Sequence, residues 1–168
     1  MKVRDRVKGL RRIKANELLP NPKNWRTHPQ AQQDALRGLL AEVGFAGALL
    51  GRETPNGVML IDGHLRAEVS PEMKVPVLVL DVTEEEADKL LASYDPLGAM
   101  AAADAGKLEA LLRDVTTKSD AVQAMFDGLA RETGAVPPDF QPVTLEEQGR
   151  LDEKVKCTCP ECGHEFTP

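Results

Sequence analysis

Short apolar runs at Val58–Ile61 and Val75–Leu80 constrain the fold of this 168-residue chain more than any other feature. Each run predicts a buried strand. The turn Thr54-Pro55-Asn56-Gly57 has hairpin chemistry and predicts another strand at Ala48–Leu50, ahead of the first run. Because Pro76 cannot donate a hydrogen bond to a sheet, it predicts an edge position or a strand start for the second run.

Helical patterns flank these strands. Apolar residues recur at helical spacing from about Gln30 to Val43, and Gly44 stands where a left-handed cap is needed. Thr83 and Glu86 form a capping box that predicts a helix to about Ser93. Together the segments predict an α+β fold, a small mixed β-sheet with flanking helices. The predicted apolar face of the first helix consists of Leu36, Leu39, Leu40 and Val43.

The chain divides into five segments. Asp104 and Ser119 predict the N-caps of two further helices, at about 105–115 and 120–132, and Gly134 predicts the end of the second. We expect this helical pair to pack on the domain or on another copy of it. The segments are a basic N-terminal arm (1–12), the α+β domain (13–97), a helical extension (98–134), a proline-containing linker (135–156) and a cysteine-containing tail (157–168).

Charge is distributed unevenly along the chain. The net charge is -6, yet residues 1–26 contain nine Lys or Arg and only two acidic residues. A basic arm on an acidic body can contact DNA phosphates while the body avoids nucleic acid, but a solvated terminus has the same composition. Both interpretations stay open.

Hydropathy gives no sign of a membrane protein. No apolar run approaches the roughly 20 residues that span a bilayer, and the charged N-terminus is not a secretory signal. We therefore expect a cytoplasmic protein with no membrane partner.

The segment Leu60–Arg66 combines the end of a buried strand, a glycine and an immediate helix start. Backbone N–H groups at a helix start favour an anion, Gly63 permits a close turn, and His64 and Arg66 add donors. Asp62 can bind a hydroxyl group or a water on Mg²⁺, or it can cap the helix. The alternative is an architectural turn in which His64 is a structural histidine.

A second polar cluster, Asn21–His28, lies just before the first helix. Asn24 can hydrogen-bond to polar edges, and Arg26 can bind a second phosphate or a carboxylate. Trp25 either anchors the loop in the core or stacks on a base. Since aromatic residues make up only 4% of the chain, we expect the core anchor.

These segments together resemble the N-terminal domain of ParB-type partition proteins and the wider ParB/sulfiredoxin superfamily. The resemblance rests on the opening LLPNPKNWRTHP, the turn Ile61–Arg66 and the strand Val75–Val79, and it covers about residues 12–97. It is greatest to small phage-type proteins that are often called ParB-like nuclease domain proteins.

The resemblance implies a site for CTP or ATP with Mg²⁺. It assigns the phosphate turn to Gly63, His64 and Arg66, and the opening motif to Asn24 and Arg26. Partition proteins usually have Gly-Glu-Arg-Arg at the turn, whereas this chain has His64 and Leu65 in place of the acid and the first arginine. The reactive cysteine that sulfiredoxin carries there is absent.

All three cysteines lie within six residues near the C-terminus. The sequence Cys159-Pro160-Glu161-Cys162-Gly163-His164 resembles half of a zinc ribbon, with two thiolates around a tight turn. Cys157 and His164 can complete a four-ligand set, which predicts a structural Zn²⁺ site rather than a disulfide framework. Completion by a second chain, or an empty knuckle, is the alternative.

These features predict a nucleotide-binding, DNA-associated ParB-like module of phage or mobile-element origin. The predicted partners are a nucleoside triphosphate, DNA at the basic arm, and a protein partner or a second copy of the chain. Two other functions stay open. One is a metal-dependent nuclease or NTP-using phosphotransferase with Asp62 and His64 as catalytic residues; the other is a non-catalytic adaptor whose nucleotide site has decayed.

Overall fold

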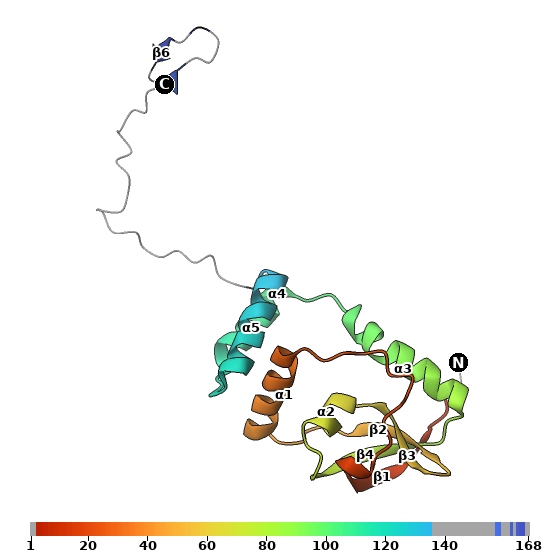
Figure 1. The fold of residues 1–168 in the computed structure, drawn as a ribbon. Helices are drawn as coiled ribbons and strands as arrows, with labels where there is room; N and C mark the ends of the chain where they lie inside the picture. The colour runs from red at the N-terminus through yellow and green to blue at the C-terminus, as the bar shows by residue number, and fades with distance from the viewer. Residues whose placement is uncertain (1–2, 136–156, 159–161, 163, 167–168) are drawn as a thin grey trace. The chain divides into compact units, whose positions relative to one another are not determined.

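The computed structural model describes residues 3–135, 157–158, 162 and 164–166. It divides into two compact units, Met1–Val136 and Pro137–Pro168, and the fold of interest lies in the first. The elements in chain order are β1 (Val7–Lys14), η1 (Ala15–Glu17), α1 (Gln30–Glu42), β2 (Leu49–Thr54), β3 (Gly57–Asp62), α2 (His64–Glu68), β4 (Lys74–Leu80), α3 (Glu84–Ala99), α4 (Ala105–Asp114), α5 (Asp120–Thr133), β5 (Cys157–Thr158) and β6 (Glu165–Phe166) (Figure 1).

The first unit is built on a four-stranded mixed sheet in the order β1-β4-β2-β3. β4 pairs antiparallel with β1 and parallel with β2, and β2 forms the expected hairpin with β3. This confirms the predicted α+β class. The edge position offered for Pro76 is wrong, because β4 is an inner strand. Pro76 is its third residue, and the parallel pairing with β2 begins one residue later, at Val77.

Residues assigned to the basic arm contribute the edge strand β1. Its pairing runs from Val7, opposite Leu80, to Lys14, opposite Lys74. The expectation of a separate arm over residues 1–12 is therefore corrected. The basic residues suit an edge strand, since one side of it faces solvent and charge there discourages pairing with another chain.

Ion pairs connect this N-terminal segment with the rest of the unit. Lys8 Nζ lies 2.7 Å from a carboxylate oxygen of Glu53 in β2. Arg6, just before β1, donates two hydrogen bonds, of 2.9 and 2.7 Å, to the carboxylate of Glu86 in α3. This guanidinium, together with the Thr83 backbone N–H of the capping box, lowers the pKa of Glu86 to about 2.

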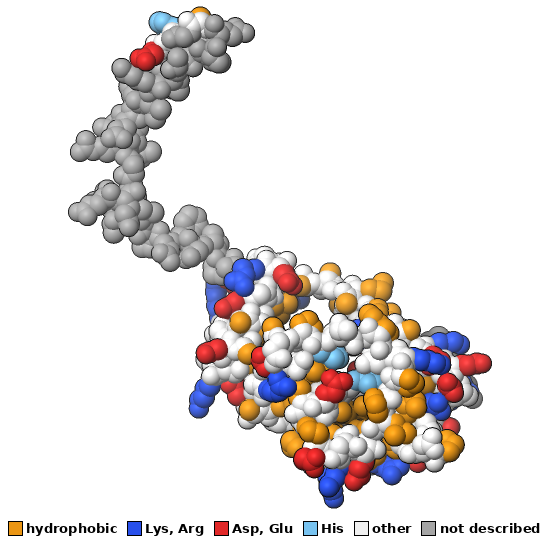
Figure 2. Space-filling model, viewed as in Figure 1, with side chains coloured by type: hydrophobic (Ala, Val, Ile, Leu, Met, Phe, Trp, Pro, Cys, Tyr) orange, Lys and Arg blue, Asp and Glu red, His pale blue; other side chains and the backbone are white. Residues whose placement is uncertain are grey.

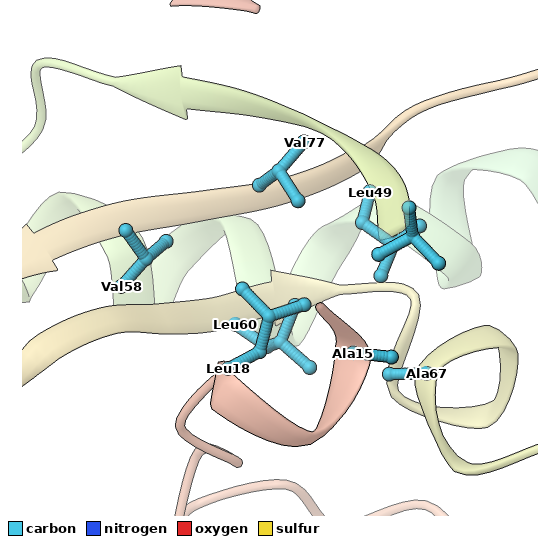
Figure 3. Packing of buried hydrophobic residues seen from close by; sticks show 8 residues of the cluster. Ala15, Leu18, Leu49, Val58, Leu60, Ala67 and Val77 are labelled. Carbon is cyan, nitrogen blue, oxygen red and sulfur yellow. The ribbon is translucent and has the colours of Figure 1, made fainter. Parts of the chain in front are cut away.

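The sheet is buried on both faces, as the alternation of side chains along the strands requires. Leu49, Leu60 and Val77 face one side, together with residues of η1 and α2 (Figure 3). Their sequence neighbours Leu50 and Ile61 face the other side, where they pack with Ala87 and other apolar residues of α3. Consecutive residues of a strand thus belong to the two hydrophobic clusters in turn. Because both faces of the sheet are buried, the strands are continuous apolar runs in the sequence.

The helices largely follow the predictions. The capping box of α3 is present, although the helix continues to Ala99 rather than ending near Ser93. Asp104 and Ser119 cap α4 and α5, and Gly134 ends α5 in the left-handed conformation.

The predicted apolar face of α1 is only partly correct. Ala35 is its buried residue, whereas Leu39 and Val43 are exposed. α1 packs against α5, whose Val122 is fully buried. The helical pair thus packs on the domain of its own chain.

The second unit is described only in part. β5 and β6 form an antiparallel pair in which Cys157 lies opposite Phe166. Most of the predicted linker falls outside the described residues. None of the helices in the described part of the chain is long and apolar enough to cross a membrane.

We predict that Gly38→Ala destabilises the packing of α1 on α5. A Cβ atom at Gly38 would lie 2.8 Å from Ser119 Cβ and 2.9 Å from Val122 Cγ2, and Ser119 is fixed as the cap of α5. We expect a loss of about 1–3 kcal/mol in the free energy of unfolding, measured by urea denaturation. Gly128→Ala in α5 is the matched control, since nothing lies within 4 Å of its Cβ position, and it should gain about 0.5–1 kcal/mol. Equal effects of the two substitutions would contradict this packing.

Candidate functional site

The loop before α1 lies against β3 through backbone hydrogen bonds. Leu19 N–H donates to Val58 O and Leu60 N–H donates to Leu19 O, each at 2.9 Å. Leu19 thereby forms a single parallel bridge with Met59 on the free edge of β3. Because the chain continues parallel to β3, Asn21 arrives beside the turn that follows this strand.

His64 joins the loop to that turn. Its side chain is only 7% exposed, and its Nε2 accepts a hydrogen bond of 3.2 Å from the backbone N–H of Asn21. An acceptor nitrogen carries no proton, so the neutral ring holds its proton on Nδ1. Burial lowers the pKa of His64, and nearby Glu68 and Asp62 oppose this shift only in part. His64 is thus a neutral residue that fixes the loop in place.

Gly63 shapes the turn between β3 and α2. Its φ of 93° lies in the left-handed region, and a Cβ atom there would lie 2.5 Å from Leu49 Cγ. Both the conformation and the close approach of β2 therefore require glycine. α2 has only five residues, so its dipole is small, and the side chains around the turn determine its chemistry.

Arg66 and Asp62 form an ion pair across this turn. Arg66 Nη2 lies 2.6 Å from Asp62 Oδ2, and Arg66 Nη1 donates to the carbonyl of Ala48 at 3.4 Å. Asp62 does not cap α2, because the capping residue is Gly63. The Arg66 side chain is 28% exposed, so the guanidinium is accessible even while it is paired.

Two asparagine turns organise the opening loop. Asn21 Oδ1 accepts from Lys23 N–H at 2.9 Å, and Asn24 Oδ1 accepts from Arg26 N–H at 3.4 Å. The carbonyl of each side chain is thereby used within the loop, as is common for asparagine in turns. The amide nitrogen of Asn24 remains as the group that can donate elsewhere.

Arg26 is held between α3 and Trp25. One guanidinium nitrogen forms an ion pair with Asp95 of α3, and the guanidinium carbon lies 5.0 Å from the centre of the Trp25 ring. Its Nε is buried and has no hydrogen-bond partner among the residues that the structure describes. The expectation that Trp25 anchors the core is wrong, since Trp25 is 60% exposed. The aliphatic side chains fill the core, and the indole lies on the surface over a cation.

A pocket of about 320 Å³ brings the predicted residues together. Its polar lining includes Asn24, Arg26, Asp62, Gly63, His64 and Arg66, which are all of the predicted nucleotide-site and catalytic residues. Apolar side chains of α1, α3 and α5 also line it, among them Leu36, Leu91 and Met125. Figure 2 shows histidine side chains near the middle of the visible face of this unit, bordered by acidic and apolar ones.

The charges in this pocket are balanced. Arg26 is paired with Asp95, and Arg66 is paired with Asp62, so two cations face two carboxylates. Guanidinium groups suit phosphate oxygens, and carboxylates suit Mg²⁺. The arrangement therefore fits a ligand that carries both, such as a metal-bound phosphate.

Sequence reasoning missed the contributions of two helices to the pocket. Gln32 in α1 and Met125 in α5 line it, but neither stands in a motif. Asp95 in α3 also lines it; the segment Tyr94-Asp95-Pro96 is at best a weak counterpart of a later Glu-Asn motif that the resemblance to partition proteins implies. For Met125 the sequence offered no signal, because its position depends on how α5 packs on α1.

The predicted zinc ligands lie in the second unit. Cys157, Cys162 and His164 are among the described residues, and Cys162 is exposed and free, while Cys159 lies outside them. Within the described residues, no three His, Cys, Asp or Glu side chains are grouped so as to hold a metal ion. Zinc binding thus stays a prediction.

We predict that His64 makes stability fall as the pH drops below its ordinary pKa of 6.5. The unfolded chain then binds a proton that the folded chain, with its lowered pKa, does not, so acid favours unfolding. In His64→Gln, which keeps an acceptor for Asn21, the free energy of unfolding should drop by about 1 kcal/mol at pH 8, and this deficit should narrow by pH 5. Urea denaturation across this range, with ¹⁵N NMR of the ring, measures both effects. This role would be contradicted if Nε2 were protonated at neutral pH. It would also be contradicted if the free energies of unfolding of the wild type and of His64→Gln changed in parallel with pH.

Comparison with known proteins identifies the fold. The chain is similar to the crystal structure of the C-terminally truncated chromosome-partitioning protein ParB from Caulobacter crescentus complexed with CTP-gamma-S, with a TM-score of 0.50 and 20% sequence identity over 62% of this chain. The match covers 60% of that chain, so this protein spans less than two thirds of the ParB structure. No family model and no curated protein matches the sequence. The first unit therefore has a ParB-like α+β fold.

Proposed function

We propose that this chain is a ParB-like module that binds a nucleoside triphosphate with Mg²⁺ in the 320 Å³ pocket. One observation carries the proposal: Arg26 and Arg66, from segments far apart in the sequence, line the same pocket beside Gly63. The similar ParB structure holds CTP-gamma-S, which supports this class of ligand.

In this proposal the two arginines bind phosphate oxygens. Each is only partly buried, at 31% exposure for Arg26 and 28% for Arg66, so its aspartate partner can be exchanged for a phosphate at small cost. The Nε of Arg26, which has no partner within the described part of the chain, is a further donor. Asp62 and Asp95, once released, are the carboxylates that would hold Mg²⁺ or its waters.

The proposal is for binding and not for hydrolysis. Nε2 of His64 already accepts a hydrogen bond, and Asp62, once released from Arg66, is assigned to Mg²⁺ or its waters, so this proposal gives neither group of the catalytic pair considered from the sequence the role of a base. His64 serves instead to position the loop. The nuclease or phosphotransferase alternative therefore gains no specific support.

DNA contact through the basic N-terminus stays a prediction. Lys8, Arg11 and Arg6 of that segment are paired with acidic side chains of the same unit. A deletion of residues 2–12 would remove most of β1 and disturb the sheet. Loss of DNA binding in such a variant would therefore reflect loss of the fold and would not show that these residues contact DNA.

We predict that the protein binds Mg²⁺ complexes of CTP, ATP or GTP, and that Arg66→Ala and Arg26→Ala each weaken this binding at least tenfold. A charge-assisted hydrogen bond contributes about 1.5–3 kcal/mol, which corresponds to about tenfold or more in Kd. Isothermal titration calorimetry with each nucleotide makes the measurement.

Arg37→Ala is the matched control for these variants. Arg37 is an exposed residue of α1, paired with Asp34 in the same helix and outside the pocket lining, so the charge change is the same. It should bind nucleotide like the wild type. The proposal is refuted if no nucleotide binds at millimolar concentration, or if Arg37→Ala weakens binding as much as Arg66→Ala.

We also propose a structural Zn²⁺ site at Cys157, Cys159, Cys162 and His164. The β5–β6 pairing supports it, because it brings the chain on either side of the knuckle together: Thr158 lies opposite Glu165, next to His164. Thiolates and an imidazole are the donors that zinc prefers in structural sites. The metal would stabilise the small second unit.

We predict about one zinc ion per chain by elemental analysis, with loss of the metal in Cys159→Ser. Thr158→Ala changes the neighbouring residue without touching a predicted ligand and should retain zinc. A protein purified without chelator that holds no zinc would contradict the site.

A further inference from the structure

A second pocket adjoins the first at the opening loop. It has a volume of about 290 Å³ and is lined by Trp25, Arg26, Thr27, His28 and Gln32. Arg26, His28 and Gln32 line both pockets, so the two share a wall. A ligand that extends out of the main pocket past Arg26 would enter this one.

Trp25 gives the second pocket an aromatic surface. The core does not use the indole, which is 60% exposed, and the Arg26 guanidinium lies over the ring at 5.0 Å. An exposed tryptophan beside a cation is a stacking platform for planar heteroaromatic rings, because both the indole and the guanidinium stack on such rings.

His28 and Gln32 give the pocket a polar edge, and their mutual hydrogen bond assigns the donor and acceptor atoms of that edge. His28 Nδ1 and Gln32 Oε1 are 3.1 Å apart, and since a carbonyl oxygen only accepts, Nδ1 is the donor. In the neutral ring, His28 Nε2 is then an acceptor, and Gln32 Nε2 remains a donor. The backbone of His28 is fixed by a hydrogen bond of 3.0 Å from Gln33 Nε2 to its carbonyl. One acceptor and one donor match the hydrogen-bonding edge of a nucleobase.

We propose that the second pocket binds the nucleobase of the nucleotide whose phosphates occupy the main pocket. The base stacks on Trp25, its edge meets His28 and Gln32, and Arg26 lies between base and phosphates. This inference rests on the proposed nucleotide site and adds the residues that distinguish a nucleotide from a bare polyphosphate.

The test compares nucleotides with inorganic tripolyphosphate, which has the phosphates and no base. The chain contains one tryptophan, so the intrinsic tryptophan fluorescence reports on Trp25 alone. In the wild type, CTP, ATP or GTP with Mg²⁺ should quench this fluorescence, while tripolyphosphate with Mg²⁺ should bind by calorimetry without the same quenching.

Substitution of Trp25 separates base binding from phosphate binding. Trp25→Ala should weaken nucleotide binding about tenfold and leave the affinity for tripolyphosphate unchanged, whereas Trp25→Phe keeps a ring and should retain most of the nucleotide affinity. Met100→Ala, at an exposed apolar residue outside both pockets, is the control and should change neither.

The outcomes distinguish the two proposals. Unchanged nucleotide affinity in Trp25→Ala, or an equal loss for nucleotide and tripolyphosphate, overturns the base pocket and leaves the phosphate site standing. Wild-type protein that binds neither ligand overturns both.

Discussion

The candidate site depends on one hydrogen bond, from the Asn21 backbone to the buried imidazole of His64. It connects a loop before the first helix with a turn that follows the third strand. An unpaired buried donor or acceptor costs about 1–3 kcal/mol, so this contact holds the loop against the turn. Arg26 is thereby placed near Arg66, and two motifs that are separate in the sequence act as one binding surface.

Paired charges set the character of the pocket before any ligand arrives. Each arginine is already paired with an aspartate, so an incoming anion must replace a carboxylate and does not bind to an unpaired guanidinium. Partly exposed ion pairs contribute little stability, which makes exchange inexpensive; a pair sealed from solvent would hold its arginine firmly. This arrangement also explains how a chain of net charge -6 can offer an anion site without a basic surface.

The sequence predicted those features that local chemistry determines. The β2–β3 hairpin, the capping box at Thr83 and the caps of α4 and α5 followed from turn and cap patterns, and the two polar motifs Asn21–His28 and Leu60–Arg66 both contribute residues to the main pocket. Features that depend on the partner of a segment were missed. Basic composition suggested a separate arm, yet β1 pairs along β4 and its charges meet Glu53. Trp25 was expected in the core because it is the one tryptophan of a chain poor in aromatic residues, but it is 60% exposed, since the aliphatic side chains fill the core without it.

The pairing of β1 with β4 has a kinetic consequence. Within the described residues, β1 pairs with β4 alone, and Val7 lies opposite Leu80. β1 therefore cannot pair in the sheet until the ribosome has synthesised the chain as far as β4. During synthesis the hairpin β2–β3 can form from local contacts alone, whereas β1 can join the sheet only after β4 has been made, at the cost of closing a long loop. A nascent chain that stalls before Leu80 therefore exposes an unpaired, basic β1, whose positive charge would slow its aggregation on the ribosome.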